Sequence, residues 1–114
     1  MNEKRKIMEQ NPTVYVGHIN GFSRVCAGRK VGLTAQLLML KIFGLFARAG
    51  WREWISIDNH ELMREIGCAS ETTIISARNR LSELGFIDYQ RGFKHVPARY
   101  RLAGKPELPE YLKN

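Results

Sequence analysis

Apolar residues recur along the middle of the chain at the three- and four-residue spacing of a buried helix. The segment AQLLMLKIFGLFARA, which follows Thr34, is apolar nearly all round. A helix of this kind is buried on more than one side. The pattern predicts a core helix, or one that shares its surface with a partner subunit, with Thr34 as N-cap. Gly50 and Trp51 end it.

Two shorter helices are predicted next. Asp58 and Glu61 fit a capping box, so NHELMREI should be a helix that ends at Gly67. A third helix, residues 71–84, begins after Ser70 or Thr72, either of which can cap it. Arg78 follows its helical period together with the apolar residues, and the side chains expected to turn inward are Ile74, Ala77, Leu81 and Leu84.

Alternating segments predict strands around these helices. EWISID (53–58) is one, and FIDYQR (86–91) and RYRL (99–102) flank a hairpin tip, GFKHVPA. The order is helix, strand, helix, turn, helix, strand, wing, strand. We therefore predict an α+β fold, mostly α, namely a winged helix-turn-helix with a small antiparallel β-wing.

The two ends of the chain lack this regularity. Residues 1–32 are expected to form an N-terminal arm, in which TVYV (13–16) is a strand or oligomerisation segment and residues 17–32 are mainly loops. Residues 33–102 form the predicted domain. Residues 103–114 contain two prolines and are expected to be a tail or linker.

The composition indicates the number of domains and the sign of the net charge. The 114 residues are 44% hydrophobic, enough for one domain with one core, and the formal net charge is +7. A basic balance favours nucleic acid, an acidic partner or an anionic membrane. The charge is also clustered, because no acidic residue lies between Asp88 and Glu107. Five basic residues fall in that interval: Arg91, Lys94, Arg99, Arg101 and Lys105.

The outer face of the third helix suits a DNA groove. Thr73, Ser76 and Arg80 form one stripe that would face the major groove, with Asn79 at its margin. Ser70 and the amides of the first turn suit a phosphate. The alternative is that this face is polar only because it is exposed, with Thr72 serving merely as a cap.

The hairpin favours the DNA interpretation. Arg91, Lys94, His95 and Arg99 lie on or near its tip, where a basic wing can hold phosphates or enter the neighbouring minor groove. The helix at 71–84 and the wing at 88–101 together predict binding to double-stranded DNA.

Other classes of function find little support. His18, His60 and His95 lack metal-ligand spacing, as do Cys26 and Cys68, and no phosphate-binding glycine loop is present. We expect no enzyme activity, no metal and no cofactor. Without an apolar leader behind the first residues, we expect a cytoplasmic protein with reduced thiols. The apolar run 33–49 is too short and too charged for a membrane span.

Three segments narrow the class. AGWREW (49–54), ARNRL (77–81) and GFIDY (85–89) resemble the N-terminal winged-helix domain of DnaD-like replication proteins (replisome organisers) of phages and mobile elements. The resemblance covers about residues 32–102. It implies a role in organising DNA at a replication origin, self-association as a homodimer or higher homo-oligomer, and contact with helicase-loading proteins. It also implies a C-terminal domain that is missing here, so the chain is a fragment or a stand-alone relative.

Two alternatives remain open. The same scaffold serves small transcriptional regulators. The apolar 33–49 helix and the N-terminal segment could instead build a protein-interaction or oligomerisation scaffold that does not read DNA.

Overall fold

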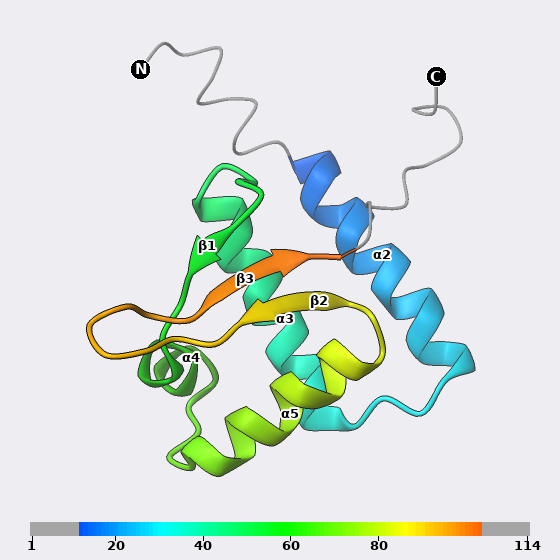
Figure 1. The fold of residues 1–114 in the computed structure, drawn as a ribbon. Coiled ribbons are helices and arrows are strands. Elements are labelled where there is room, and N and C mark those ends of the chain that lie inside the picture. The colour runs from blue at the N-terminus through cyan, green and yellow to red at the C-terminus, as the bar shows by residue number, and fades with distance from the viewer. Residues whose placement is uncertain (1–11, 104–114) are drawn as a thin grey trace, which may run out of the picture.

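Helices make up most of the chain that the computed structural model describes, residues 12–103. In chain order the elements are α2 (Pro12–Gly28), α3 (Leu33–Arg48), β1 (Ile55–Ser56), α4 (Asn59–Ile66), α5 (Glu71–Glu83), β2 (Ile87–Gln90) and β3 (Arg99–Leu102) (Figure 1). The described chain is therefore an α+β domain, mostly helical, with a small antiparallel sheet. The predicted arm over residues 1–11 and nearly all of the predicted tail lie outside the described residues.

Helix α3 is the centre of the core, as its sequence predicted. Leu38, Ile42 and Phe46 on it are almost fully buried, and α2, α4 and α5 all pack against it. The helix begins two residues earlier than expected. Gly32 is the N-cap and Thr34 lies within the first turn, so the prediction of Thr34 as the cap was wrong.

The segment before α3 differs most from the prediction. Residues predicted as a strand and loops form the long helix α2 instead. Tertiary packing explains the difference, because Phe22 is buried against the rings of Phe43 and Phe86. Burying such an apolar face outweighs the weak local preferences of β-branched residues and glycines. Residues 12–28 thus belong to the folded domain rather than to an arm.

Both helix starts in the α4–α5 unit rest on side-chain caps. An Asp58 carboxylate oxygen accepts from the Glu61 N–H at 2.8 Å, and Gly67 ends α4 with a left-handed backbone, φ 65°. Ser70 is the cap of α5, since its Oγ accepts from the Thr73 N–H at 3.2 Å. The sequence had left Ser70 and Thr72 as alternatives, and the structure selects Ser70.

The sheet has the strand order β1-β3-β2, and both pairs are antiparallel. Tyr100 on the central strand pairs with Ile55 on one side and Tyr89 on the other, and its side chain is fully buried. The loop between β2 and β3, residues 91–98, projects from the body past α4 (Figure 1). No helix within residues 12–103 has the length and apolar character needed to cross a membrane.

Candidate functional site

The outward face of α5 carries most of the residues expected at a binding surface. Thr72, Ser76, Asn79 and Arg80 are exposed, whereas Thr73 is half-buried. Ser70 also lies at the surface, but its hydroxyl is occupied by the cap at the start of α5. The face is therefore polar and open, with small side chains in the first two turns and longer ones in the third.

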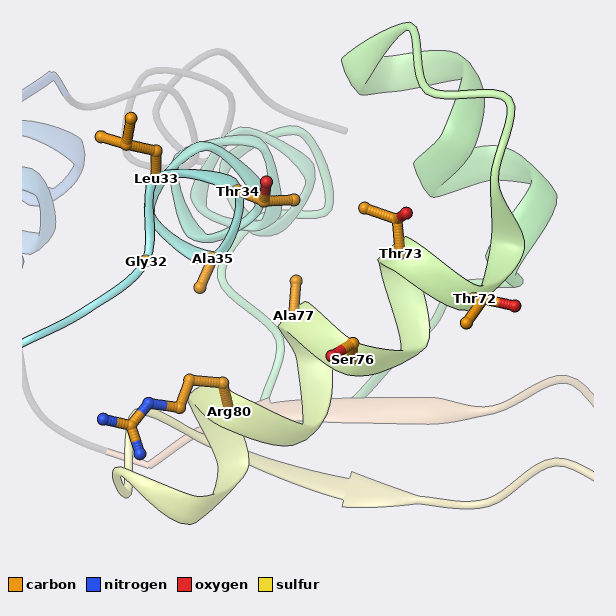
Figure 2. A pocket seen from close by; sticks show the side chains of 9 residues that line it. All are labelled: Gly32, Leu33, Thr34, Ala35, Thr72, Thr73, Ser76, Ala77 and Arg80. Atoms are coloured by element: carbon orange, nitrogen blue, oxygen red, sulfur yellow. The ribbon is translucent and has the colours of Figure 1, made fainter.

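The predicted stripe of Thr73, Ser76 and Arg80 borders a hollow of about 730 Å³ between α5 and the first turn of α3. Figure 2 shows Ala77 and Thr73 facing Thr34 and Ala35 across this hollow. Asn79 does not line it. The stripe is thus one surface, but it faces the start of α3 as well as solvent.

Arg80 is tied to a segment fifty residues away in sequence. Its Nη2 donates to the carbonyl oxygen of Lys30, in the loop between α2 and α3, at 2.9 Å. Its Nη1 lies 3.8 Å from the Glu83 carboxylate, a distant pair between exposed groups that stabilises little. In Figure 2 the side chain extends along the hollow toward that loop. Arg80 therefore joins the α2–α3 loop to α5 while its charge stays at the surface.

The β2–β3 loop holds three further predicted residues. Arg91, Lys94 and His95 are all exposed, and neither Arg91 nor Lys94 forms a hydrogen bond or ion pair with any other described residue. The loop is nonetheless ordered by its backbone. Phe93 and Val96 exchange two hydrogen bonds of 2.9 and 2.7 Å, and His95 has a left-handed φ of 65°. Its basic side chains are thus held out from a well-defined turn.

Arg99 is separated from the other predicted basic residues. It lies on β3, where its guanidinium carbon is 5.0 Å from the centroid of the Trp54 ring and its Nη1 donates to the Gln90 Oε1 at 3.2 Å. Arg101, two residues on, covers the same ring at 4.7 Å and pairs with Asp88 at 2.7 Å. Arg101 is therefore neutralised, whereas Arg99 has no carboxylate partner among the described residues. Arg99 is held by Gln90 and the Trp54 ring, so it has less freedom than Lys94 to meet an outside anion.

A second hollow, of about 600 Å³, lies on the other flank of α5, where α4 begins and β2 ends. Arg78 and Tyr89 form part of its wall, together with Arg91. Arg78 is only 7% exposed, and its guanidinium carbon lies 3.9 Å from the centroid of the Tyr89 ring. Within residues 12–103 it has no carboxylate partner, and its Nε makes no hydrogen bond. The sequence places Arg78 on the helical period of Ile74 and Leu81 without assigning it to the inward or the outward face, and the structure shows that it is buried.

Tyr100 lies behind Arg78, and its hydroxyl also makes no hydrogen bond. Burial raises the pKa of Tyr100 to about 12, and the nearby positive charge of Arg78 opposes that rise. The phenol therefore stays protonated at neutral pH. Among the described residues there is also no group of three or more His, Cys, Asp or Glu side chains that could hold a metal ion.

The fold and this surface together define a small, mostly helical α+β domain with an exposed polar helix beside an ordered basic loop. No family model, no curated protein and no solved structure matches the chain.

The sequence did not predict that the α2–α3 loop and the start of α3 contribute to this surface. The start of α3, Gly32 to Ala35, forms one wall of the first hollow, and the Lys30 carbonyl fixes Arg80. No local motif marks such a contact, because it depends on where the α2–α3 loop passes in space. The one available signal was the helical period of the apolar residues in α2.

Proposed function

We propose that the chain is a DNA-binding domain of the winged helix-turn-helix class, with α5 as the recognition helix and the β2–β3 loop as the wing. The element order supports this. An α3–β1–α4–α5–β2–β3 chain with sheet order β1-β3-β2 puts α4 and α5 in helix-turn-helix relation and sets a hairpin beside them. The observation that carries the proposal is the pairing of an exposed polar α5 face with a loop whose Arg91 and Lys94 have no partner within residues 12–103.

The charges are arranged in a way that suits a polyanion. On the outer sheet face Arg101 is paired with Asp88 and Glu53, whereas the loop cations Arg91 and Lys94 have no ion-pair partner among the described residues. A phosphate backbone would therefore meet its free cations at Arg91 and Lys94, next to α5. On α5 itself, Thr72, Ser76 and Asn79 are short enough to allow close approach to base edges, and Arg80 can reach guanine.

The finer role rests on the resemblance to DnaD-like replication proteins carried by Trp51, Trp54 and the segments 77–81 and 85–89. We propose that the domain acts on duplex DNA in replication initiation, with helicase-loading proteins as further partners, and that it has no catalytic role.

The test is duplex binding measured by fluorescence anisotropy at several salt concentrations. About five cations on phosphates would give a slope of log affinity against log salt of roughly −4 to −5. Arg80→Ala should cost about 1–3 kcal/mol on a specific site, and Lys94→Ala should weaken every duplex alike.

Arg52→Ala is the matched control, because Arg52 is exposed between α3 and β1, away from the start of α3 that borders the hollow. It removes the same charge and should leave affinity nearly unchanged. Equal losses on specific and random DNA for Arg80→Ala and Lys94→Ala would contradict base reading by Arg80. Equal losses for all three variants would mean that only net charge matters.

A second candidate function, self-association, is favoured by one observation. Leu33, Leu37 and Leu40 are 85%, 43% and 36% exposed, and their spacing places them along one side of α3. An apolar stripe of this kind is typical of a helix that packs against another chain. Sedimentation should show a dimer or larger oligomer that a Leu33→Gln, Leu37→Gln double variant reduces to monomer. A monomeric wild-type chain would exclude it.

A further inference from the structure

The tip of the β2–β3 loop has a fixed shape that does not depend on the core. Gly92 allows this shape, because a Cβ at that position would lie 2.7 Å from both the Ala98 nitrogen and the Val96 oxygen. The reciprocal hydrogen bonds between Phe93 and Val96 then close the turn, which passes through His95 in the left-handed conformation. The loop therefore has a rigid backbone conformation and projects from the domain.

This rigid projection exposes an aromatic ring. Phe93 is 72% exposed, and it makes no ring-stacking or cation–π contact with another described residue. Val96, across the turn, is 40% exposed. Leaving a phenyl ring in water forgoes the free energy of burial that the core aromatics gain. The Phe93 ring does not pack in the core of the domain. The turn closed by Phe93 and Val96 directs it outward.

The surroundings of the ring indicate what it meets. Arg91 and Lys94 flank Phe93 in sequence, and both are exposed and unpaired among the described residues. An apolar ring between free cations is complementary to a surface with anions at its edges and apolar faces between them. Duplex DNA presents this pattern where a base step opens, because two phosphate rows border the minor groove and the apolar base faces are exposed once the step is unstacked.

We propose that Phe93 is a wedge that enters the minor groove of duplex DNA and partly unstacks one base step while Arg91 and Lys94 hold the flanking phosphates. This rests on the proposed function, since it assumes that α5 lies in the adjacent major groove. Apolar wedges of this kind kink the duplex by roughly 20–90°. The wing would then bend DNA as well as anchor the domain.

The wedge makes a specific prediction about damaged duplexes. A step that is already unstacked costs less to open, so a wedge binds it more tightly than an intact step. We would compare two duplexes of about 24 base pairs that both carry a central 2-aminopurine. One has a mismatched base pair beside the 2-aminopurine, and the other is fully paired. Wild-type protein should bind the mismatched duplex at least about fivefold more tightly, and its binding should raise the 2-aminopurine fluorescence.

Three variants distinguish the contribution of the Phe93 ring from that of the Lys94 charge. Phe93→Ala should lose the preference and the fluorescence change, and it should weaken binding to the intact duplex less than binding to the mismatched duplex. Phe93→Leu keeps an apolar wedge and should retain part of both. Lys94→Ala is the matched control from the same loop, and it should weaken both duplexes equally. Because Phe93 is exposed, thermal unfolding of the Phe93 variants should match the wild type.

The possible failures are distinguishable. If the wild type binds intact duplex but shows no preference and no fluorescence change, the wedge is wrong and DNA binding stands. If a single strand binds more tightly than either duplex in a Phe93-dependent way, the ring stacks on unpaired bases and the duplex wedge is overturned. Phe93-dependent binding to phosphatidylserine vesicles, with DNA affinity unaffected by Phe93→Ala, would assign the tip to a membrane surface instead. A wild-type chain that binds no DNA overturns both proposals.

Discussion

Arg78 stacks on Tyr89, with its guanidinium carbon 3.9 Å from the centroid of the ring, and the pair joins α5 to the first strand of the hairpin. The guanidinium is buried without a carboxylate among the described residues, and its one hydrogen bond, to the Asn79 Oδ1, is 3.1 Å long. The aromatic ring therefore supplies much of what compensates the buried charge.

Arg78→Lys is expected to lower the free energy of unfolding by about 1–3 kcal/mol. A compact ammonium cannot stack flat on Tyr89 and would be buried with less compensation. Arg78→Met, which removes the charge and keeps the length, should cost less than Arg78→Lys. Urea unfolding of the two variants measures the difference. A lysine variant as stable as the wild type would show that the stacking contributes little.

His18 should make the domain sensitive to acid. It stacks on Trp51 at 4.6 Å between centroids, and burial lowers its pKa from 6.5 to about 4. The unfolded chain therefore binds a proton at His18 more readily than the folded chain does. The stability that neutral His18 contributes is fully present above about pH 6.5. As the pH falls toward 4, the free energy of unfolding decreases by up to about 3 kcal/mol.

This effect is measured by comparing urea unfolding at pH 7 and pH 4.5 for the wild type and for His18→Phe. The phenylalanine keeps the ring packing and cannot take up a proton, so the variant should lose less stability on acidification. His60→Gln, at an exposed position of α4, is the control for the loss of a histidine outside the core. Identical acid profiles for wild type and His18→Phe would contradict the assignment.

The cap of α5 gives a prediction that separates stability from binding. Ser70→Ala removes the acceptor for the Thr73 N–H and should destabilise the domain by about 1 kcal/mol. Thr72→Ala, at an exposed position of the first turn, should change stability by less than about 0.5 kcal/mol and weaken DNA binding instead. Thermal unfolding gives the first quantity and anisotropy the second. The reverse order of stabilities would mean that Thr72 is the working cap.

Gly92 should tolerate no side chain. Gly92→Ala places a Cβ 2.7 Å from backbone atoms of Val96 and Ala98, which must then move apart. We expect a loss of about 1–3 kcal/mol, with amide shifts confined to the β2–β3 loop and weaker DNA binding. Gly28→Ala is the control, since a Cβ at Gly28 would have nothing within 4 Å. If both variants unfold at the wild-type midpoint, the loop is not held as tightly as its contacts indicate.

Features fixed by local chemistry could be predicted from the sequence. The Asp58 cap, the stop at Gly67 and the inward face with Ile74 and Leu81 each depend on residues within a few positions. Helix α2 could not be predicted from local preference. Its stripe of Tyr15, Ile19, Phe22 and Cys26 packs on the core, but the β-branched residues and glycines between them favour other structures.

In the candidate site, too, some features could be predicted from the sequence and others could not. The exposure of Ser76 and Arg80 follows from the helical period, and the exposure of Lys94 follows from the turn residues around it. The link from Arg80 to the Lys30 carbonyl and the position of Arg99 over Trp54 depend on the packing of distant segments. Residue type and spacing carry no information on such contacts, so these could be found only in three dimensions.

The strand order of the sheet has a consequence for how the chain comes to be folded. β3 is the last element within the described residues, yet it is the central strand, and β1 has no other strand to pair with. As the chain leaves the ribosome, α2 to α5 emerge before Tyr100 is available to fill its place in the core. Until β3 emerges, β1 has no strand to pair with and Ile87 lacks its pairing partner Leu102. We therefore expect the sheet to close only after α2 to α5 have emerged.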